Sequence, residues 1–342
     1  MLAQEKGKVI TAGGLLESAE LGRVMMHEHL YCDIYDWAAQ RLITEEQPIT
    51  PERRELLMTA AVPPLKECNQ HGCHALVDAT PAPWRAWPTF YQEISRAANM
   101  HIILCTGFYR EVELSSYWAK TPATQIWPFV REATVEQLAE FCEREIMEGL
   151  CGTAVRAGAI KLGSSQSVMT AAEEKAFRAG ARAQKATGVH ITTHCTRLGA
   201  ETSQLELFDR EGVDLSRVVI GHTAWHLTDA NCRKVCLGWM KRGANFLPTN
   251  LGISEDGGKA WQPLVDAIHA VFDAGLGSCL VLGLDWAFTS ESGPFAPCGF
   301  VPPPPFLHLF THTLPAFRAM GLTSSEEEIM MQVNPQRILP VQ

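Results

Sequence analysis

Two histidines stand one residue apart in an apolar run near the start of the chain. His27 and His29 flank Glu28 within VMMHEHL, residues 24–30. On a β-strand, residues two apart point to the same face, so both imidazoles would meet at one spot while Glu28 points away. Neutral imidazole is a common ligand of zinc and related divalent ions. The stretch alone is weak evidence for a metal-binding pair. Glu28 is expected to have a structural role, or to support the metal ligands, rather than to act in catalysis.

Further polar residues end apolar runs along the rest of the chain: Lys161, His194, His222 and Asp285. Taken singly, each has an ordinary explanation, such as a rim histidine, a lysine that reaches the surface, or an aspartate that caps a helix. Taken together with the first pair, they are costly to bury around one axis unless something binds them. The whole set therefore predicts one shared site.

The elements that must position these residues alternate between short β-type runs and amphipathic helices. We expect strands at residues 24–30, 74–80, 101–107, 157–163, 190–195, 218–223, 244–249 and 279–287. We expect helices such as 134–150, 171–188 and 229–243, and glycines close many of these helical runs. This alternation implies right-handed βαβ units, and eight of them in this length suit a (β/α)₈ TIM barrel of the α/β class. The polar residues lie near the carboxyl ends of their strands, where such barrels carry their chemistry.

The same pattern predicts a single domain over residues 1–342. Residues 1–22 would form an N-terminal β extension. The proline-rich segment 288–306 follows the eighth strand directly, so it is interpreted as a long loop over the barrel mouth rather than as an interdomain linker. No G-x-G-x-x-G follows the first strand, which disfavours a dinucleotide-binding fold.

The composition limits which molecules the protein is expected to bind and in which cellular compartment we expect it. The 342 residues carry a net charge of −9, so no basic surface favours nucleic acid or an anionic membrane. No stretch reaches the roughly 20 apolar residues of a membrane span, and no signal peptide is recognisable. The 11 cysteines include no C-x-x-C pair, which favours reduced core thiols over a disulfide framework or a zinc ribbon. We expect a cytoplasmic protein with a small-molecule substrate, and the sequence leaves a homodimer open.

The candidate ligands are too numerous for one catalytic ion, which must keep a position open for substrate. Four histidines and one aspartate divide naturally into two sites, about 3.5–4 Å apart in a two-metal hydrolase. Two such ions need an anionic bridge, whereas a lysine ammonium would repel them. The residue types alone therefore leave Lys161 unexplained.

The segments HEHL, IKLG, TTHC, IGHT and LDW, in this order, resemble the phosphotriesterase family of the amidohydrolase superfamily, from about residue 7 to residue 339. The resemblance implies that Lys161 is carboxylated to N6-carboxylysine, which bridges the two ions together with a hydroxide. It also implies that His27, His29 and Asp285 bind the more buried ion, and that His194 and His222 bind the more exposed one. Zinc is the first choice for the two divalent ions per chain, with manganese, cobalt or iron as alternatives.

The resemblance further implies a mechanism in which the bridging hydroxide attacks an ester-type bond and Asp285, as the catalytic residue, takes its proton. His226, just after the sixth strand, would relay that proton outward or be a surface histidine. Tyr109 would line the substrate pocket, and Trp286 and Phe288 would add an apolar wall.

The end of the seventh strand bears on the substrate. Lactonases of the family typically carry Asp-Arg there and phosphotriesterases Asp-His, whereas this chain has Pro248-Thr249. The departure argues against a specialist for acyl-homoserine lactones and against an organophosphate specialist. We therefore favour a lactone or a carboxylic ester, with a phosphotriester or an amide as the alternative. A non-catalytic binding protein on a barrel scaffold and an oxidoreductase are the alternatives of another class.

Overall fold

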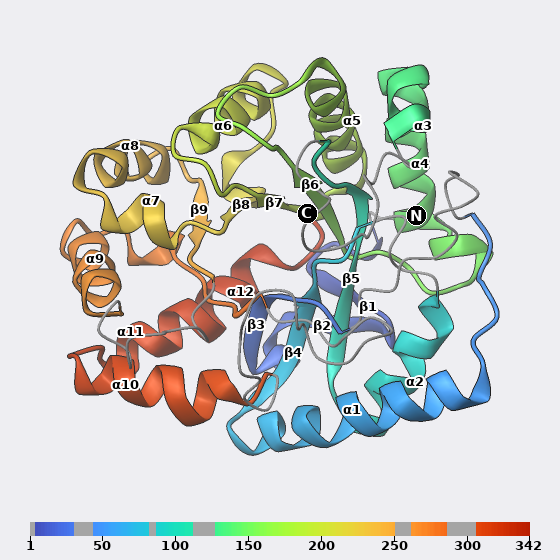
Figure 1. Cartoon of the computed structure of the whole chain (residues 1–342), viewed down its shortest axis with the longest axis horizontal. Helices are drawn as coiled ribbons and strands as arrows, with labels where there is room; N and C mark the ends of the chain where they lie inside the picture. The colour runs from blue at the N-terminus through green and yellow to red at the C-terminus, as the bar shows by residue number, and fades with distance from the viewer. Residues whose placement is uncertain (1–3, 31–43, 82–86, 112–126, 250–260, 286–305) are drawn as a thin grey trace.

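A parallel sheet of seven strands forms the centre of the molecule. The computed structural model describes residues 4–30, 44–81, 87–111, 127–249, 261–285 and 306–342 (Figure 1). The strands neighbour one another in chain order: β3 (Arg23–Glu28), β4 (Cys73–Asp78), β5 (His101–Phe108), β6 (Ala159–Gly163), β7 (His190–His194), β8 (Val218–Gly221) and β9 (Asn245–Leu247). Every adjacent pair is parallel, which confirms the first seven predicted strands.

Helices surround this sheet, as Figure 1 shows. They are α1 (Pro51–Gln70), α2 (Pro88–Ala98), α3 (Trp127–Glu132), α4 (Val135–Met147), α5 (Ala171–Thr187), α6 (Ala200–Arg210), α7 (Ala224–Thr228), α8 (Ala230–Met240), α9 (Trp261–Asp273), α10 (Leu314–Ala319), α11 (Ser324–Glu328) and α12 (Asn334–Ile338). The three helices predicted at 134–150, 171–188 and 229–243 are confirmed as α4, α5 and α8. Capping boxes at Thr134 and Thr170 begin α4 and α5, and Gly188 ends α5 with a positive φ of 74°.

The eighth predicted strand is not a regular strand within the described residues, yet its segment 280–285 joins β9 to β3 and so closes the ring. The backbone hydrogen bonds that do this run from Val281 N to Phe246 O (3.1 Å), from Met26 N to Leu282 O (2.9 Å) and from Asp285 N to His27 O (2.8 Å). Gly283 is required there, because a Cβ at that position would lie 2.7 Å from the backbone nitrogen of His27. The predicted α/β barrel is therefore confirmed, with an irregular eighth segment.

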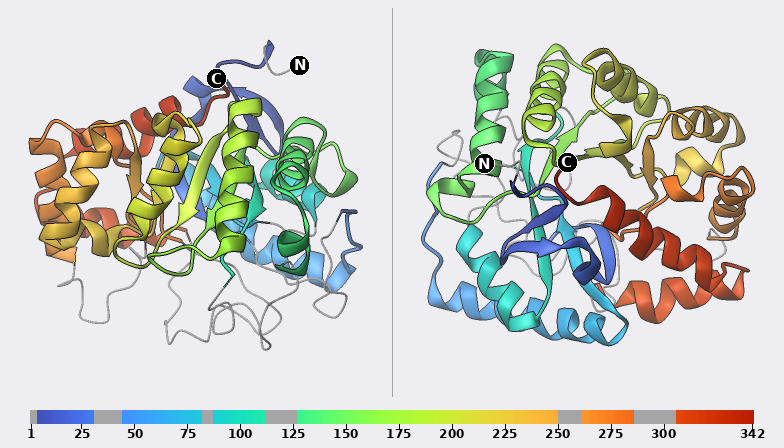
Figure 2. Two further views of the ribbon diagram at one scale, coloured as in Figure 1. Left: turned by 90° about the horizontal axis from the view of Figure 1, so that it is seen from above. Right: turned by 180° about the vertical axis from the view of Figure 1, so that it is seen from behind.

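The amino ends of the barrel strands lie beneath a hairpin of β1 (Lys8–Thr11) and β2 (Gly14–Glu17). Gly7 and Lys8 exchange backbone hydrogen bonds with Val341 (2.8 and 2.9 Å), so the two ends of the chain meet at this end of the barrel (Figure 2). The hairpin lies within the predicted extension 1–22. Of the predicted loop 288–306, only Phe306 is among the described residues. No described helix is long and apolar enough to cross a membrane.

The hydrophobic core has two parts. An inner cluster fills the barrel with side chains from β3, β4, β5, β6, β8 and β9, and an outer cluster joins the sheet to the helices. Val24 and Met26 belong to the inner cluster and Met25 to the outer one, as strand alternation requires. The pairing of β3 with β4 then shifts register between Met25 and Glu28. A bulge of this kind lets His27 face inward directly after Met26.

Candidate metal centre

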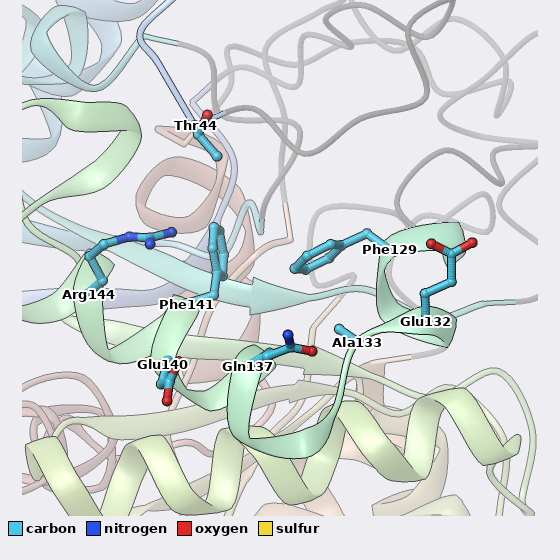
Figure 3. A pocket seen from close by; sticks show the side chains of 8 residues that line it. All are labelled: Thr44, Phe129, Glu132, Ala133, Gln137, Glu140, Phe141 and Arg144. Atoms are coloured by element: carbon cyan, nitrogen blue, oxygen red, sulfur yellow. The ribbon is translucent and has the colours of Figure 1, made fainter.

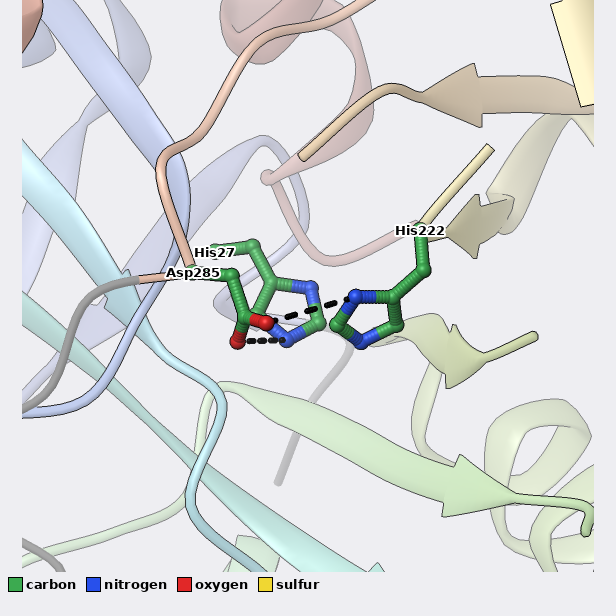
Figure 4. A group of neighbouring side chains, drawn as sticks. All are labelled: His27, His222 and Asp285. Carbon is green, nitrogen blue, oxygen red and sulfur yellow. Dashed lines mark ion pairs between the residues drawn. The ribbon is translucent and has the colours of Figure 1, made fainter. Parts of the chain in front are cut away.

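The structure brings all six predicted ligand side chains to the carboxyl ends of the strands. His27 and Lys161 meet with 2.8 Å between His27 Nε2 and Lys161 Nζ. His29 Nε2 lies 3.2 Å from Asp285 Oδ1, and His222 Nδ1 lies 3.4 Å from Asp285 Oδ2. The ring of His194 lies beside that of His222, tilted by 56° with 4.2 Å between centroids. Figure 4 shows His27, His222 and Asp285, whose donor atoms all lie within 4.8 Å of one another.

Two of these residues have an unusual backbone. His222 and Asp285 adopt positive φ angles of 61° and 60°, in a region that side chains other than glycine rarely occupy. Each stands just past the carboxyl end of its strand or segment, where the chain must turn away while its side chain still points inward. Such strain costs about 1–3 kcal/mol per residue and typically accompanies function. Here it aims an imidazole and a carboxylate at the same point.

Neighbouring hydroxyl groups hold the imidazoles. Thr80 Oγ1 lies 2.8 Å from His29 Nδ1, and Thr249 Oγ1 lies 2.8 Å from His222 Nδ1. The sequence interpretation missed both threonines as site residues, although Thr249 was noticed as a departure from the family pattern. Tyr109 was predicted to line the pocket, and its hydroxyl lies 3.2 Å from His194 Nδ1. Hydrogen bonds of this type fix the tautomer and the orientation of a ligating ring.

The electrostatics of the cluster favour neutral imidazoles around an anionic carboxylate. Burial, reinforced by Lys161, lowers the pKa of His27 well below its usual value. Burial likewise lowers the pKa of His194 and brings the pKa of His222 to about 3. Burial alone would raise the pKa of Asp285, but His222 and His29 hold it below its usual value. These are the protonation states in which the side chains bind a metal ion.

The donor set fits divalent ions. Within this cluster, three buried ring nitrogens have no hydrogen-bond partner: His27 Nδ1, His194 Nε2 and His222 Nε2. Unsatisfied buried nitrogens are costly unless something binds them. Imidazole nitrogens with a carboxylate suit zinc, manganese, iron or cobalt.

Glu28 points away from this cluster, as predicted from its position between the two histidines. Its Oε1 atom accepts a 2.7 Å hydrogen bond from Leu284 N, so it fastens β3 to the irregular eighth segment. Asp78 at the end of β4 acts similarly, because its carboxylate accepts from the backbone nitrogens of Leu30 and Thr80. Burial raises the pKa of Asp78. Both carboxylates thus support the loops that carry the imidazoles.

The predictions for His226, Trp286 and Phe288 have other outcomes. His226 is fully buried, so its interpretation as a surface histidine is wrong. Its ring lies beside Cys195 and Glu201 on the outer side of the barrel wall rather than beside Asp285. The structure thus gives no support to a proton relay through His226. Trp286 and Phe288 lie outside the described residues, and their role in the pocket stays a prediction.

A separate cavity of about 540 Å³ lies between α3 and α4 (Figure 3). It is lined by Thr44, Phe129, Glu132, Ala133, Gln137, Glu140, Phe141 and Arg144. None of these residues stands at a strand end, and none was predicted for the site. The cavity therefore does not belong to the histidine cluster.

The fold and the cluster define an α/β barrel with metal-type donors at the carboxyl ends of its strands. A model described as the phosphotriesterase family matches residues 7–339. The chain belongs to the phosphotriesterase family, which confirms the resemblance seen in the sequence, and it is a hydrolase of that family. The family is typically dependent on divalent metals.

Relatives and solved structures agree with this assignment. The phosphotriesterase homology protein of Mycobacterium tuberculosis is 27% identical, over 96% of this chain and 96% of its own. The N-acetyltaurine hydrolase of Dictyostelium discoideum is 22% identical, over 99% of this chain and 100% of its own. The solved structure of an organophosphorus hydrolase from Deinococcus radiodurans is 27% identical and superposes with a TM-score of 0.80, covering 98% of this chain and 97% of that one.

Proposed function

We propose that this chain is a binuclear metal-dependent hydrolase that cleaves a lactone or a carboxylic ester. The observation that carries the proposal is the arrangement around Lys161, whose Nζ lies 2.8 Å from His27 Nε2 among neutral imidazoles. A buried lysine in this place fits a metal centre only as an anion, which carboxylation by carbon dioxide supplies. His27, His29 and Asp285 would hold one ion, His194 and His222 the other, and carboxylated Lys161 would bridge them.

When bound, the two ions would polarise the carbonyl oxygen of the substrate and lower the pKa of a water molecule, which then attacks at neutral pH. The side chains of the cluster would accept the proton and orient the metal ligands. Asp285 would be ionised, because His222 and His29 hold its pKa below its usual value, and its carboxylate would accept the proton that the attacking water loses. Thr80 and Thr249 orient the imidazoles of His29 and His222 through their 2.8 Å hydrogen bonds.

Tyr109 would line the side of the substrate pocket next to His194. Its side chain is buried and its ring packs edge-on to His194, with 5.1 Å between centroids. A substrate held against His194 would therefore meet the phenol. Thr249, which bonds to His222, stands where lactonases of the family typically carry arginine. This difference disfavours the transfer of acyl-homoserine lactone specificity to this chain.

An amide substrate is the second candidate, because full-length relatives are N-acetyltaurine hydrolases. The test is turnover of a matched panel of lactones, carboxylic esters, amides and phosphotriesters by metal-loaded protein, with metal content measured on the same sample. We expect two catalytic ions per chain, counted as the metal that Lys161→Ala loses relative to the wild type, and the highest kcat/KM on a lactone or ester. Preferred turnover of an amide or a phosphotriester would refute the substrate assignment. Turnover without bound metal would refute the mechanism.

A further inference from the structure

A second group of metal-type side chains lies on the outer side of the barrel wall, beside the same two strand ends. Cys195 follows His194 directly after β7, and His226 in α7 comes four residues after His222. Glu201 in the first turn of α6 and Cys232 in the first turn of α8 complete the group. Cys195, Glu201 and His226 are almost completely buried, and Cys232 is 9% exposed.

The distances within this group match those between the ligands of a zinc ion. His226 Nε2 lies 3.6 Å from Cys195 Sγ and 3.3 Å from Glu201 Oε2. Glu201 Oε1 lies 3.5 Å from Cys232 Sγ. A tetrahedral zinc ion, with bonds of about 2.3 Å to sulfur and about 2.0 Å to nitrogen and oxygen, separates sulfur from either by about 3.5 Å and nitrogen from oxygen by about 3.3 Å. The Cys195, His226 and Glu201 Oε2 atoms match these separations, whereas Cys232 lies beside the other carboxylate oxygen, Oε1.

The hydrogen bonds around His226 leave room for a cation. Its Nε2 atom faces acceptors on three sides: the carboxylate of Glu201, the sulfur of Cys195 and, at 3.1 Å, the carbonyl oxygen of Arg197. One imidazole nitrogen carries at most one proton, so it cannot donate to all three. A divalent ion would bind the carboxylate, the imidazole and the sulfur together, while Glu201 Oε2 keeps its 2.8 Å hydrogen bond from Gly199 N. Cysteine and histidine with a carboxylate are ligands that zinc prefers.

We propose that Cys195, Glu201 and His226, whose donor atoms lie within 4.8 Å of one another, form a structural zinc site separate from the catalytic centre. Cys232, which lies beside the other oxygen of Glu201, would turn inward as the fourth ligand. Binding releases one proton from each thiol, so two thiolates, a carboxylate and an imidazole surround the ion. The site links α6, α7 and α8 to the end of β7. It would thereby fix the backbone that carries His194 and His222 on the opposite side of the wall. The nine described cysteines are free and buried, as the sequence predicts. No sequence motif indicates this group, because its members are spread over 38 positions without a C-x-x-C pair.

Cobalt tests the proposal in the intact protein, because cobalt bound to thiolate gives a charge-transfer absorption in the near ultraviolet. The histidine, aspartate and lysine of the catalytic cluster cannot produce that band. We expect metal-free wild-type protein titrated with Co²⁺ to develop the band to a stoichiometry of one ion per chain. Lys161→Ala should keep the band, which separates this site from the proposed catalytic centre. Uptake of cobalt by the wild type without a thiolate band would overturn the proposal.

Cysteine-to-serine variants show which thiolates produce the charge-transfer band. Cys195→Ser and Cys232→Ser should each weaken it strongly and lower the zinc content by one ion per chain. Cys68→Ser removes another buried cysteine, from α1, and should change neither quantity. The double variant Cys32→Ser/Cys298→Ser removes the cysteines outside the described residues and should also keep the band. Survival of the band in both Cys195→Ser and Cys232→Ser would overturn the proposal, and if these variants fail to fold the wild-type titration still decides it.

Discussion

Replacement of His222 by glycine should leave the metal-free protein more stable than replacement by alanine. Both substitutions remove the same imidazole, so they differ only in how the new residue tolerates a φ of 61°. An L-residue with a Cβ pays about 1–2 kcal/mol in the left-handed region, whereas glycine pays almost nothing. Glycine loses about 0.5–1 kcal/mol more chain entropy on folding. The difference leaves the glycine variant more stable by about 0.5–1 kcal/mol.

His194 supplies the matched control. It ends β7, is buried to a similar degree as His222, and is not among the described residues with positive φ. There the order should reverse, with His194→Ala more stable than His194→Gly. The measurement is the urea midpoint of each metal-free variant, followed by circular dichroism, with thermal midpoints at one fixed scan rate if unfolding is irreversible. Equal or greater stability of His222→Ala over His222→Gly would refute the strain argument.

Three further outcomes are expected. Lys161→Ala should lose both catalytic ions and turnover together. Lys161→Glu should bind part of the metal, and Lys161→Arg should bind none. Full activity of Lys161→Arg would exclude the carboxylated lysine. Glu28→Gln should keep more than about a thousandth of the wild-type rate, because loss of an acid–base residue would cost about that factor. It should lower the free energy of unfolding by about 1 kcal/mol, because it weakens the hydrogen bond that Glu28 accepts from Leu284 N. Thr249→Val, which removes the hydroxyl 2.8 Å from His222 Nδ1, should weaken metal binding about 10–100-fold in a metal titration. Thr249→Ser should restore it.

Much of the barrel could be predicted because each strand is an apolar run of its own. The first seven strands occur in the predicted order, and six polar residues converge because parallel strands bring their carboxyl ends to one rim. The eighth segment departs from a regular strand, and no periodicity reveals that departure. It depends on the close approach of Gly283 to His27 and on the left-handed turn at Asp285.

The supporting residues of the site escaped prediction for a different reason. Thr80 and Thr249 are short, uncharged side chains whose role depends on which imidazole lies across from them. His226 was misplaced because a histidine shortly after a strand gives no sign of which side of the wall it occupies. The bulge in β3 also has no sequence signal, although it decides that Met26 and His27 both face inward. Such features are fixed by three-dimensional neighbours rather than by spacing.

The contact between Glu28 in β3 and the eighth segment, residues 280–285, also determines when the site can form during protein synthesis. Glu28 and Leu284 are separated by 256 positions, and the backbone nitrogen of Asp285 donates to the carbonyl oxygen of His27 between the same two segments. A ribosome therefore exposes His27 and His29 long before it has made the carboxylate that completes their site. During that interval the growing chain offers unpaired histidines, and the finished pocket arises only when nearly the whole polypeptide has emerged. The two proposed ions can therefore be loaded only late in synthesis or after it, when the supply of metal and carbon dioxide would decide how much of the site is filled.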